Sequence, residues 1–375
     1  MTMTRDSAAA VAQEPRARRP RLGAPASWSP RTRWLVTLVG LVLAIGGTFL
    51  LDPYRNYLLA LGCAYLCAIA GLSLLVGRTG QLSLGHAAFM AAGAYGFALT
   101  SNALDEADAV GPVHLLVPFV AAVVAATVLG AVVGVAGARL HGPYLAGVTL
   151  ALVMALPAVT SLASGVLGGD AGIYIEVERR PDVLSRIIAV EQWQAWVALV
   201  AAALVLGLCA QLVRSPIALR MQAVRDDEPA ARLAGIDPVR TRVSMFAVSA
   251  ATAGLGGGVL AYVTQAASPG AYSLSFSLFL LVAVVIGGVG TLAGAVYGTV
   301  VLVLVPELTA AITGALPLPT ELSRRLDGNL AIAVFGVILV VVMLAAPRGV
   351  DGAVAVLVRR IRNRRPRTLR TPPQQ

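Results

Sequence analysis

Long apolar runs separated by short polar segments fill most of this 375-residue chain. A helix needs roughly 18–20 apolar residues to cross a bilayer, and about eight runs reach that length. They cover residues 34–51, 57–76, 83–100, 113–137, 143–163, 193–213, 243–265 and 329–346. The pattern predicts an all-α fold, namely a polytopic transmembrane helical bundle with about eight full spans.

A further apolar region, residues 275–306, is interrupted by Gly287, Gly288 and Gly290. Two short helices that meet inside a membrane are tolerated where protein or a water-filled cavity covers their backbone. We therefore expect a Gly-broken pair of short helices that lines a pathway through the bundle, giving about ten membrane segments. Two ordinary, short, tilted spans are the alternative interpretation.

Basic residues predict the orientation, because cytoplasmic segments next to membrane spans carry an excess of Arg and Lys. Residues 1–33 hold seven Arg and residues 347–375 hold eight, so both termini are predicted to be cytoplasmic. The segment 101–112 has acidic and no basic residues, which favours the outside. The number of crossings agrees with this only if 275–306 crosses twice or returns to the side from which it entered.

The chain divides into three regions by composition. Residues 1–33 form an Arg- and Pro-rich tail that we expect to be disordered. Residues 34–350 form the transmembrane domain, and residues 351–375 form a second basic cytoplasmic tail. We expect the arginines of this second tail to orient the chain and to contact membrane lipid rather than nucleic acid.

The composition excludes several classes of protein. The chain is 57% hydrophobic and 13% charged, whereas soluble domains carry about 25% charged residues. All 29 basic residues are Arg, and the chain has no Lys. A P-loop ATPase needs a Lys on the nucleotide phosphates and a Schiff-base enzyme needs a reactive Lys, so both are excluded.

Few side chains inside the predicted spans could carry chemistry. Cys63, Cys67 and Cys209 lie in apolar runs, and no His or carboxylate lies near the first two in sequence. We expect buried cysteines, no disulfide framework and no bound metal. The spans contain no Asp, Glu or Arg, and His86 is the ionisable residue well inside one, apart from the cysteines. This argues against a proton symporter and leaves sodium coupling less well excluded.

A charged segment stands between two of the apolar runs. Residues 214–242, called the charged loop below, hold ten charged residues, six of them Arg. Asp226, Asp227 and Glu228 precede Pro229, a typical helix start, and Gly235 is a typical helix stop.

The helix predicted inside the charged loop, residues 229–234, is too short to be stable alone. Ala230, Leu233 and Ala234 would line one of its faces. Isolated helices of this length are unstable in water, so we expect another protein to dock against it. An earlier helix is predicted over residues 217–224.

The charged loop resembles a known motif. Glu228-Pro229-Ala230-Ala231, followed by Gly235-Ile236, is similar to the cytoplasmic coupling loop of ABC importer permeases, in the form found in the branched-chain amino acid permease family. In the general ABC version, Glu stands directly before the two Ala residues, whereas here Pro229 intervenes. Residues 71–89, 168–173, 287–294 and 346–350 also resemble segments of that family. The resemblance covers about residues 55–352 and indicates the longer of its two permease subunits.

The resemblance implies a transport subunit of the bacterial plasma membrane that is not itself an enzyme. Its partners would be a second permease subunit, two ATP-binding subunits that hydrolyse the ATP, and an external substrate-binding protein; this chain would bind no cofactor. The family carries branched-chain and other amino acids, amides or urea. The residues that would contact the ATP-binding subunit are Arg225, Asp226, Asp227, Glu228, Ala230, Ala231, Leu233 and Gly235.

Two further groups of residues carry predictions. Small polar side chains and exposed backbone suit the passage of a zwitterion, and the candidates for the pathway are Gln81, Ser83, His86, Gly287, Gly288 and Gly290. The alternative is that Gln81 and Ser83 cap a helix while His86 is hydrogen-bonded between helices. Glycines four residues apart let helices approach closely, and those predicted to pack helices are Gly254, Gly258, Gly290, Gly294 and Gly298.

Two rival functions remain at this point. A stand-alone carrier or channel for a small polar solute would work without partners, and the lack of carboxylates in the spans speaks against it. A membrane enzyme would need a cluster of nucleophilic, metal-binding or acid–base residues, and the sequence contains none that we can recognise.

Overall fold

The computed structural model describes residues 30–107, 112–138, 143–175, 188–315, 329–346 and 349–363. The chain forms two units, residues 1–40 and residues 41–375, which divide within helix α1 (Pro30–Gly47). The elements and contacts described below all belong to the second unit.

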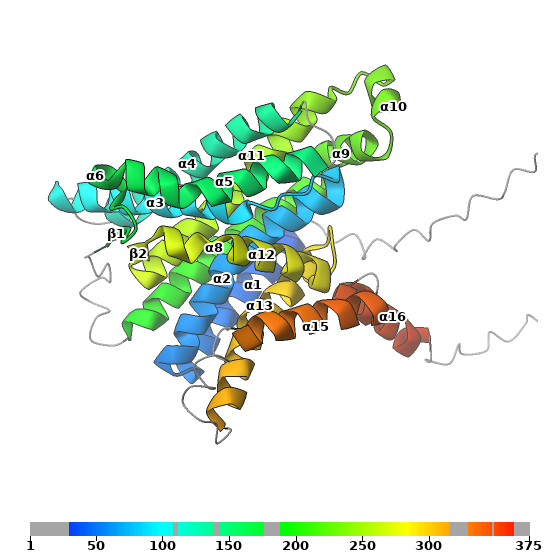
Figure 1. Cartoon of the computed structure of the whole chain (residues 1–375). Helices are drawn as coiled ribbons and strands as arrows, with labels where there is room; N and C mark the ends of the chain where they lie inside the picture. The colour runs from blue at the N-terminus through cyan, green and yellow to red at the C-terminus, as the bar shows by residue number, and fades with distance from the viewer. Residues whose placement is uncertain are drawn as a thin grey trace, which may run out of the picture. The chain divides into compact units, whose positions relative to one another are not determined.

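The second unit is built almost entirely from helices (Figure 1). Its first half contains η1 (Thr48–Leu50), α2 (Pro53–Leu74), the π-helical turn η2 (Leu75–Thr79), α3 (His86–Glu106), α4 (Pro112–Ala138), α5 (Pro143–Leu162), α6 (Ser164–Leu167) and the short strand β1 (Ile173–Tyr174). Its second half contains α8 (Val190–Arg214), α9 (Pro216–Asp226), α10 (Glu228–Leu233), α11 (Pro238–Thr264), strand β2 (Ala266–Ala267), η3 (Pro269–Tyr272), α12 (Leu274–Gly287), α13 (Leu292–Ala315), α15 (Asn329–Ala345) and α16 (Gly349–Asn363).

The apolar runs of the sequence become helices, as the pattern predicts. Six helical stretches among the described residues are long and apolar enough to cross a membrane. They are Pro53–Thr79, Val113–Gly137, Tyr144–Leu162, Val190–Arg214, Pro238–Thr264 and Leu292–Ala311. The all-α polytopic class is therefore confirmed, while the total of about ten membrane segments stays a prediction.

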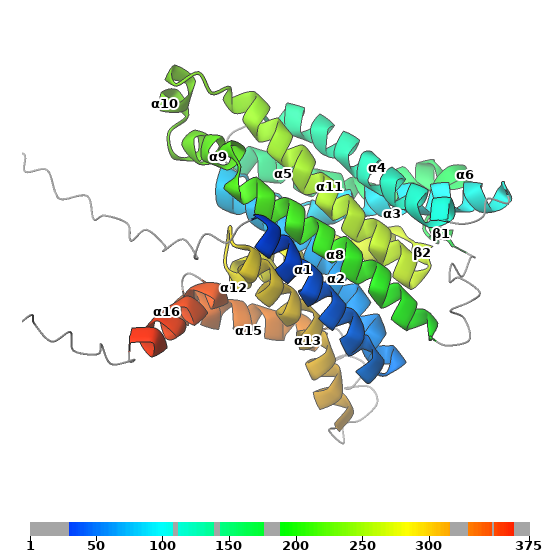
Figure 2. The same cartoon turned by 180° about the vertical axis from the view of Figure 1, so that it is seen from behind.

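Helix α11 packs against α2, α3 and α4, and Figure 2 shows it running alongside α4 and α8. Its glycines allow this close contact. A Cβ on Gly257 would lie 2.6 Å from the carbonyl carbon of Met90 in α3. One on Gly256 would lie 2.5 Å from the carbonyl oxygen of Ala64 in α2. Both distances are too short for real atoms, so only glycine permits these backbones to touch.

The predicted glycine break at 287–290 is present, but the second helix is longer than expected. Helix α12 has 14 residues and ends at Gly287, where Gly288 (φ 126°) and Gly290 (φ 79°) turn the chain. Helix α13 then runs for 24 residues and includes Pro306. It therefore does not end near residue 306, as the expectation of two short helices required.

A break also separates α2 from α3. The π-helical turn η2 ends at Gly80, whose φ of 69° is left-handed, and residues 80–85 then run without regular structure into α3. This segment is fixed against α5 by the Leu84 backbone N–H, which donates to Thr149 Oγ1 at 3.0 Å. It is also fixed against α12 by Ser277 Oγ, which donates to the Leu84 carbonyl at 2.6 Å.

The two strands join distant parts of the chain. Strand β1 pairs antiparallel with β2, with Ile173 opposite Ala267 and Tyr174 opposite Ala266. The pairing ties the segment that follows α6 to the end of α11.

The close contacts of α11 generate a prediction. Replacing Gly257 by Ala should lower the melting temperature of the purified protein in detergent, because the new methyl group must displace the α3 backbone at a cost of about 1–3 kcal/mol. Gly207→Ala in α8 is the matched control, since a methyl group there would meet no atom within 4 Å and alanine favours a helix by up to ~1 kcal/mol. Equal melting temperatures for the two variants would contradict the packing role of Gly257.

Candidate functional site

The charged loop forms two short helices at one end of α8 and α11 (Figure 1). Helix α9 covers Pro216–Asp226 and helix α10 covers Glu228–Leu233. The sequence predicts them at 217–224 and 229–234, so both lie within about two residues of their predicted ends.

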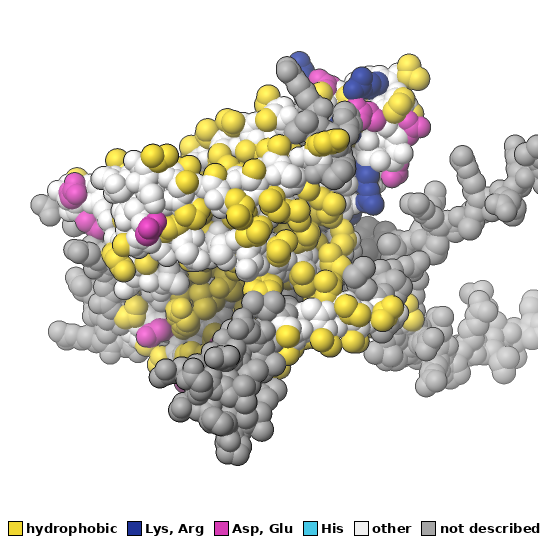
Figure 3. All heavy atoms as spheres, in the orientation of Figure 1, with side chains coloured by type: hydrophobic (Ala, Val, Ile, Leu, Met, Phe, Trp, Pro, Cys, Tyr) yellow, Lys and Arg dark blue, Asp and Glu magenta, His cyan; other side chains and the backbone are white. Residues whose placement is uncertain are grey.

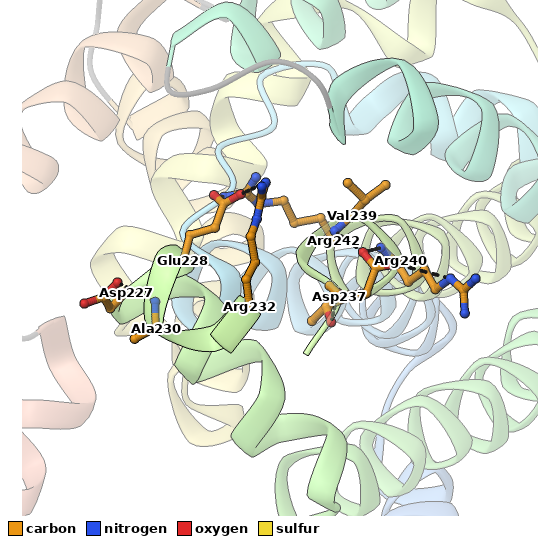
Figure 4. A network of polar contacts seen from close by, with 9 residues as sticks. Asp227, Glu228, Ala230, Arg232, Asp237, Val239, Arg240 and Arg242 are labelled. Carbon is orange, nitrogen blue, oxygen red and sulfur yellow. Dashed lines mark hydrogen bonds and ion pairs between the residues drawn. The ribbon is translucent and has the colours of Figure 1, made fainter. Parts of the chain in front are cut away.

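Helix α10 begins at a side-chain cap. Asp227 has an extended backbone, with φ −156° and ψ 101°, and its carboxylate accepts a hydrogen bond from the Ala230 N–H at 3.0 Å (Figure 4). Pro229 follows in the first turn, where its missing N–H leaves no bond unmade. Asp227, which the sequence places among the predicted docking residues, is thus also the N-cap of α10.

The end of α10 is equally well defined. Gly235 has a left-handed φ of 78°, its N–H donates to the Arg232 carbonyl at 3.0 Å, and the Ile236 N–H donates to the Ala231 carbonyl at 3.0 Å. This pair of bonds is the Schellman arrangement, which satisfies the last carbonyls of a helix. Asp237 then caps α11 by accepting from Val239 N–H at 2.9 Å and Arg240 N–H at 3.1 Å (Figure 4).

Glu228 ties α10 to α11. Its carboxylate accepts hydrogen bonds from Arg232 at 2.7 Å and from Arg242, in α11, at 2.6 Å (Figure 4). Partial burial raises the pKa of Glu228, but the hydrogen bonds and charges of the two arginines outweigh this effect and hold the pKa below its usual value. The ion pair holds α10 in a fixed orientation against α11.

That orientation turns an apolar surface outward. Ala231 is buried, whereas Ala230 and Ala234 are exposed and Leu233 is 91% exposed. Leu219 of α9 is also exposed. Figure 3 shows hydrophobic side chains between Arg, Asp and Glu side chains at this end of the molecule. The face predicted from the spacing of Ala230, Leu233 and Ala234 is therefore the face that points away from the chain.

Arg225 and Asp226 differ in their surroundings. Arg225, in the last turn of α9, donates from Nη1 to the Gly77 carbonyl in η2, and its methylenes lie beside Gly80. Asp226 is exposed. Arg225 is exposed as well, but its hydrogen bond ties it to η2.

Gln81, Ser83 and His86 lie together in and after the segment between η2 and α3, and all three are buried. Gln81 Oε1 accepts from Thr79 Oγ1 at 3.2 Å. Ser83 Oγ and both ring nitrogens of His86 make no hydrogen bond within the described part of the chain. The Ala68 backbone comes near the His86 ring without hydrogen-bond geometry.

Gly288 and Gly290, also predicted for the pathway, do not lie beside Gln81, Ser83 and His86. Gly290 packs directly on Gly77, and Gly288 packs on Gly349 at the start of α16. The Gly290 N–H donates to Ser73 Oγ of α2 at 3.0 Å. The segment with Gln81, Ser83 and His86 instead meets α12 near its beginning, where the Ala87 N–H donates to Ser277 Oγ at 3.3 Å.

The glycines predicted to pack helices occupy helix contacts. Gly254 and Gly258 of α11 lie against Ala122 of α4. Gly298 of α13 lies against Ala283 of α12, and Gly294 lies against Gly287 and Gly288.

Three features of the site were not predicted from the sequence. They are the hydrogen bond from Gly290 to Ser73, the ion pair between Arg242 and Glu228, and the contact between Arg225 and Gly77. In each case the partners lie far apart along the chain, so no local pattern marks them.

These observations define a multi-pass helical membrane protein with a structured, charged loop outside the bundle. A family model described as branched-chain amino acid transport system / permease component matches residues 54–346. The chain belongs to this family. No solved structure gives a significant match to it.

Named relatives support the same assignment. The chain is 30% identical over 289 residues to the high-affinity branched-chain amino acid transport system permease protein LivM of Salmonella typhimurium, and equally to that of Escherichia coli. Each match covers 72% of this chain and 66% of the relative, just under two thirds of the relative's length. A probable LivM of Methanocaldococcus jannaschii is 25% identical over 265 residues, or 68% of this chain and 74% of the relative.

The ion pair of Glu228 generates a prediction about α10. At neutral pH, Glu228→Gln should raise the amide exchange of residues 230–234 by about two- to fivefold, as expected for ion pairs worth up to ~1 kcal/mol. Because the pKa of Glu228 is lowered, the pair stabilises wild-type α10 above the usual glutamate pKa and is lost as pH falls through the lowered value.

Hydrogen exchange across an acid titration, corrected for intrinsic rates, measures both effects. The wild-type chain should show an acid step in α10 that Glu228→Gln lacks. Asp226→Asn, which neutralises an exposed neighbouring carboxylate, is the control and should keep the step. An identical acid step in the Glu228→Gln variant would show that this ion pair does not hold α10.

Proposed function

We propose that the chain is a transmembrane permease subunit of an ATP-driven ABC importer. Its family, and the names of its relatives, support branched-chain or other amino acids, or related small solutes, as the cargo. The observation that carries the proposal is α10. This helix of six residues is capped at both ends and pinned by Glu228, yet it presents Leu233 and Ala230 to the outside.

The exposed face of α10 is suited to a protein partner. A short helix gains little stability alone, and no part of the described chain covers Leu233, which is 91% exposed. The proposed partner is one of two ATP-binding subunits, which would hydrolyse ATP for a chain that has no Lys for a P-loop of its own. The proposed docking residues are Asp226, Asp227, Ala230, Leu233 and Gly235, which are exposed. Of the other residues expected to meet the partner, Ala231 is buried, and Glu228 and Arg225 hold the loop in place through Arg242 and Gly77, respectively. A second permease subunit and an external substrate-binding protein would complete the importer.

The proposed translocation pathway involves the two breaks in the helices. The segment before α3 places Ser83 and His86, buried and without hydrogen bonds among the described residues, at the start of a helix. Half-helix ends of this kind serve as sites for charged solute groups in other transporters. Gln81 and the glycines 287, 288 and 290 are the remaining candidates.

The proposed topology follows from the arginines. Both termini and the charged loop would lie on the cytoplasmic side of a bacterial plasma membrane, with about ten membrane segments between the basic ends. The regions 1–33, 34–350 and 351–375 would be a cytoplasmic tail, the permease domain and a second tail that contacts lipid.

The docking proposal predicts the effect of a bulky charge on the exposed face. Ala230→Arg should abolish co-purification of the ATP-binding subunit with this chain, because the guanidinium cannot enter an apolar contact. The chain itself should still insert and purify in wild-type amounts. Gly235→Asp should act in the same direction by straining the left-handed turn that ends α10.

The control is Ala103→Arg, the same change at an exposed position of α3. It should leave the ATP-binding subunit bound. Normal co-purification with both Ala230→Arg and Gly235→Asp would refute docking at α10.

The pathway proposal predicts a transport defect for His86→Ala. The variant should take up less radiolabelled leucine in proteoliposomes of the complete importer, because a buried polar group of the pathway is removed. Co-purification of the ATP-binding subunit, measured on the same preparations, should be unchanged. Uptake at the wild-type rate would remove His86 from the pathway.

A further inference from the structure

The end of α2, continued by η2, contacts three other parts of the chain. These are α9 of the charged loop, α11, and the turn between α12 and α13, which Gly77 touches. The meeting point holds the one described hydrogen bond that links the charged loop to η2, from Arg225 to Gly77.

Arg225 acts there as a cap supplied by another helix. The last carbonyls of a helix have no intrahelical partner, and a basic side chain near them both satisfies a carbonyl and interacts favourably with the helix dipole. Arg225 meets both conditions, because its guanidinium donates to the Gly77 carbonyl and its methylenes cover Gly80. Arg78 lies close enough to interact electrostatically with Arg225, so the helix end faces two cations.

Gly77 contacts the glycine turn through the backbone, with no side chain in between. A Cβ on Gly290 would lie 3.1 Å from the Gly77 Cα, which is tighter than an ordinary contact. One on Gly77 would clash with the Gly290 backbone. Packed interiors have few voids and low compressibility, so a shift of one backbone toward the other would displace it.

A second bond holds the same turn. The Gly290 N–H donates to Ser73 Oγ at 3.0 Å, and Ser73 Oγ in turn donates to the Thr291 carbonyl at 3.5 Å. Ser73 is fully buried and lies one helical turn before Gly77. The glycine turn is therefore fastened to the same end of α2 that Arg225 caps.

We propose that Arg225 is a positioning residue that transmits the movement of the charged loop, through Gly77, to the glycine turn at residues 287–291. This inference rests on the proposed function, because the movement would come from the docked ATP-binding subunit. Helix α10 would make the contact with that subunit, and Arg225 at the end of α9 would carry the displacement to the turn that the pathway proposal includes.

The test follows the turn directly and needs no transported solute. Hydrogen exchange of residues 286–293 is compared in the purified complex, without nucleotide and after trapping with ATP and vanadate. Trapping should change exchange there in the wild type. Arg225→Gln should reduce this change at least threefold while the ATP-binding subunit stays bound, and Arg225→Lys, which keeps a donor and a charge, should restore part of it.

Matched variants separate transmission from a general effect on folding. Arg220→Gln alters an exposed arginine of the same helix and should keep the full change. Ser73→Ala should reduce the change, and adding Arg225→Gln to it should cause little further loss, because both act on one linkage. Ser249→Ala removes another buried serine hydroxyl. Its effect on the exchange change should be independent of Arg225→Gln, so the two effects should simply add.

The outcomes distinguish this inference from the proposed function. An ATP-binding subunit that fails to bind the wild-type chain would overturn both. If the subunit binds but trapping changes the exchange of residues 286–293 in Arg225→Gln as much as in the wild type, the transmission role alone is overturned. The same holds if the subunit binds and trapping causes no change in the wild type. Loss of the subunit from Arg225→Gln would also overturn it, because Arg225 would then belong to the docking surface.

Discussion

Direct contact between backbones, made possible by glycine, is the constraint on which the rest of this structure depends. An apolar bundle in lipid gains little from burying apolar side chains, so close van der Waals packing holds its helices together. Here Gly256 and Gly257 bring α2 and α3 onto α11. Glycine also lets Gly290 pack on Gly77, whose carbonyl accepts a hydrogen bond from Arg225 of the charged loop. Contacts of this kind are close and hardly compressible, so they fix the bundle and, in the proposed transmission, would carry displacement.

The charged loop is stabilised in a different way from the bundle, because it must be stable in water. Its shorter helix, α10, is held by an N-cap, a left-handed glycine and an ion pair to α11, which together replace the packing that a helix of this length lacks. The stabilising contacts all lie on the inner side and at the ends. The outer side, with Leu233, is exposed. The loop would thus already be in shape for the proposed docking before a partner arrives.

The sequence predicts the parts of this structure that depend on neighbouring residues. Apolar runs of about 20 residues gave helices, and Asp227, Pro229 and Gly235 gave the ends of α10, because caps and turns are decided within a few positions. Arg225 and Gly77 are 148 positions apart and Ser73 and Gly290 are 217 apart, and no periodicity marks such pairs. Helix α13 was expected to be short because the apolar run ends at residue 306, yet the helix continues past Pro306 to Ala315, since membrane helices tolerate an internal proline.

Membership of the permease family rests on residues 54–346, and the geometry adds what membership alone does not supply. It shows which side of α10 is free, which residues hold it, and how its neighbour α9 reaches the bundle. A chain without Lys cannot form a P-loop, so in the proposed importer the energy of ATP hydrolysis would reach this chain through contact with a partner.

Photo-crosslinking from position 233 tests the central claim, that α10 docks an ATP-binding subunit, most directly. A photoreactive residue in place of Leu233 should capture the ATP-binding subunit in membranes that contain the whole importer, whereas the same residue at Ala103 should not. Capture from neither position, or equally from both, would contradict the account.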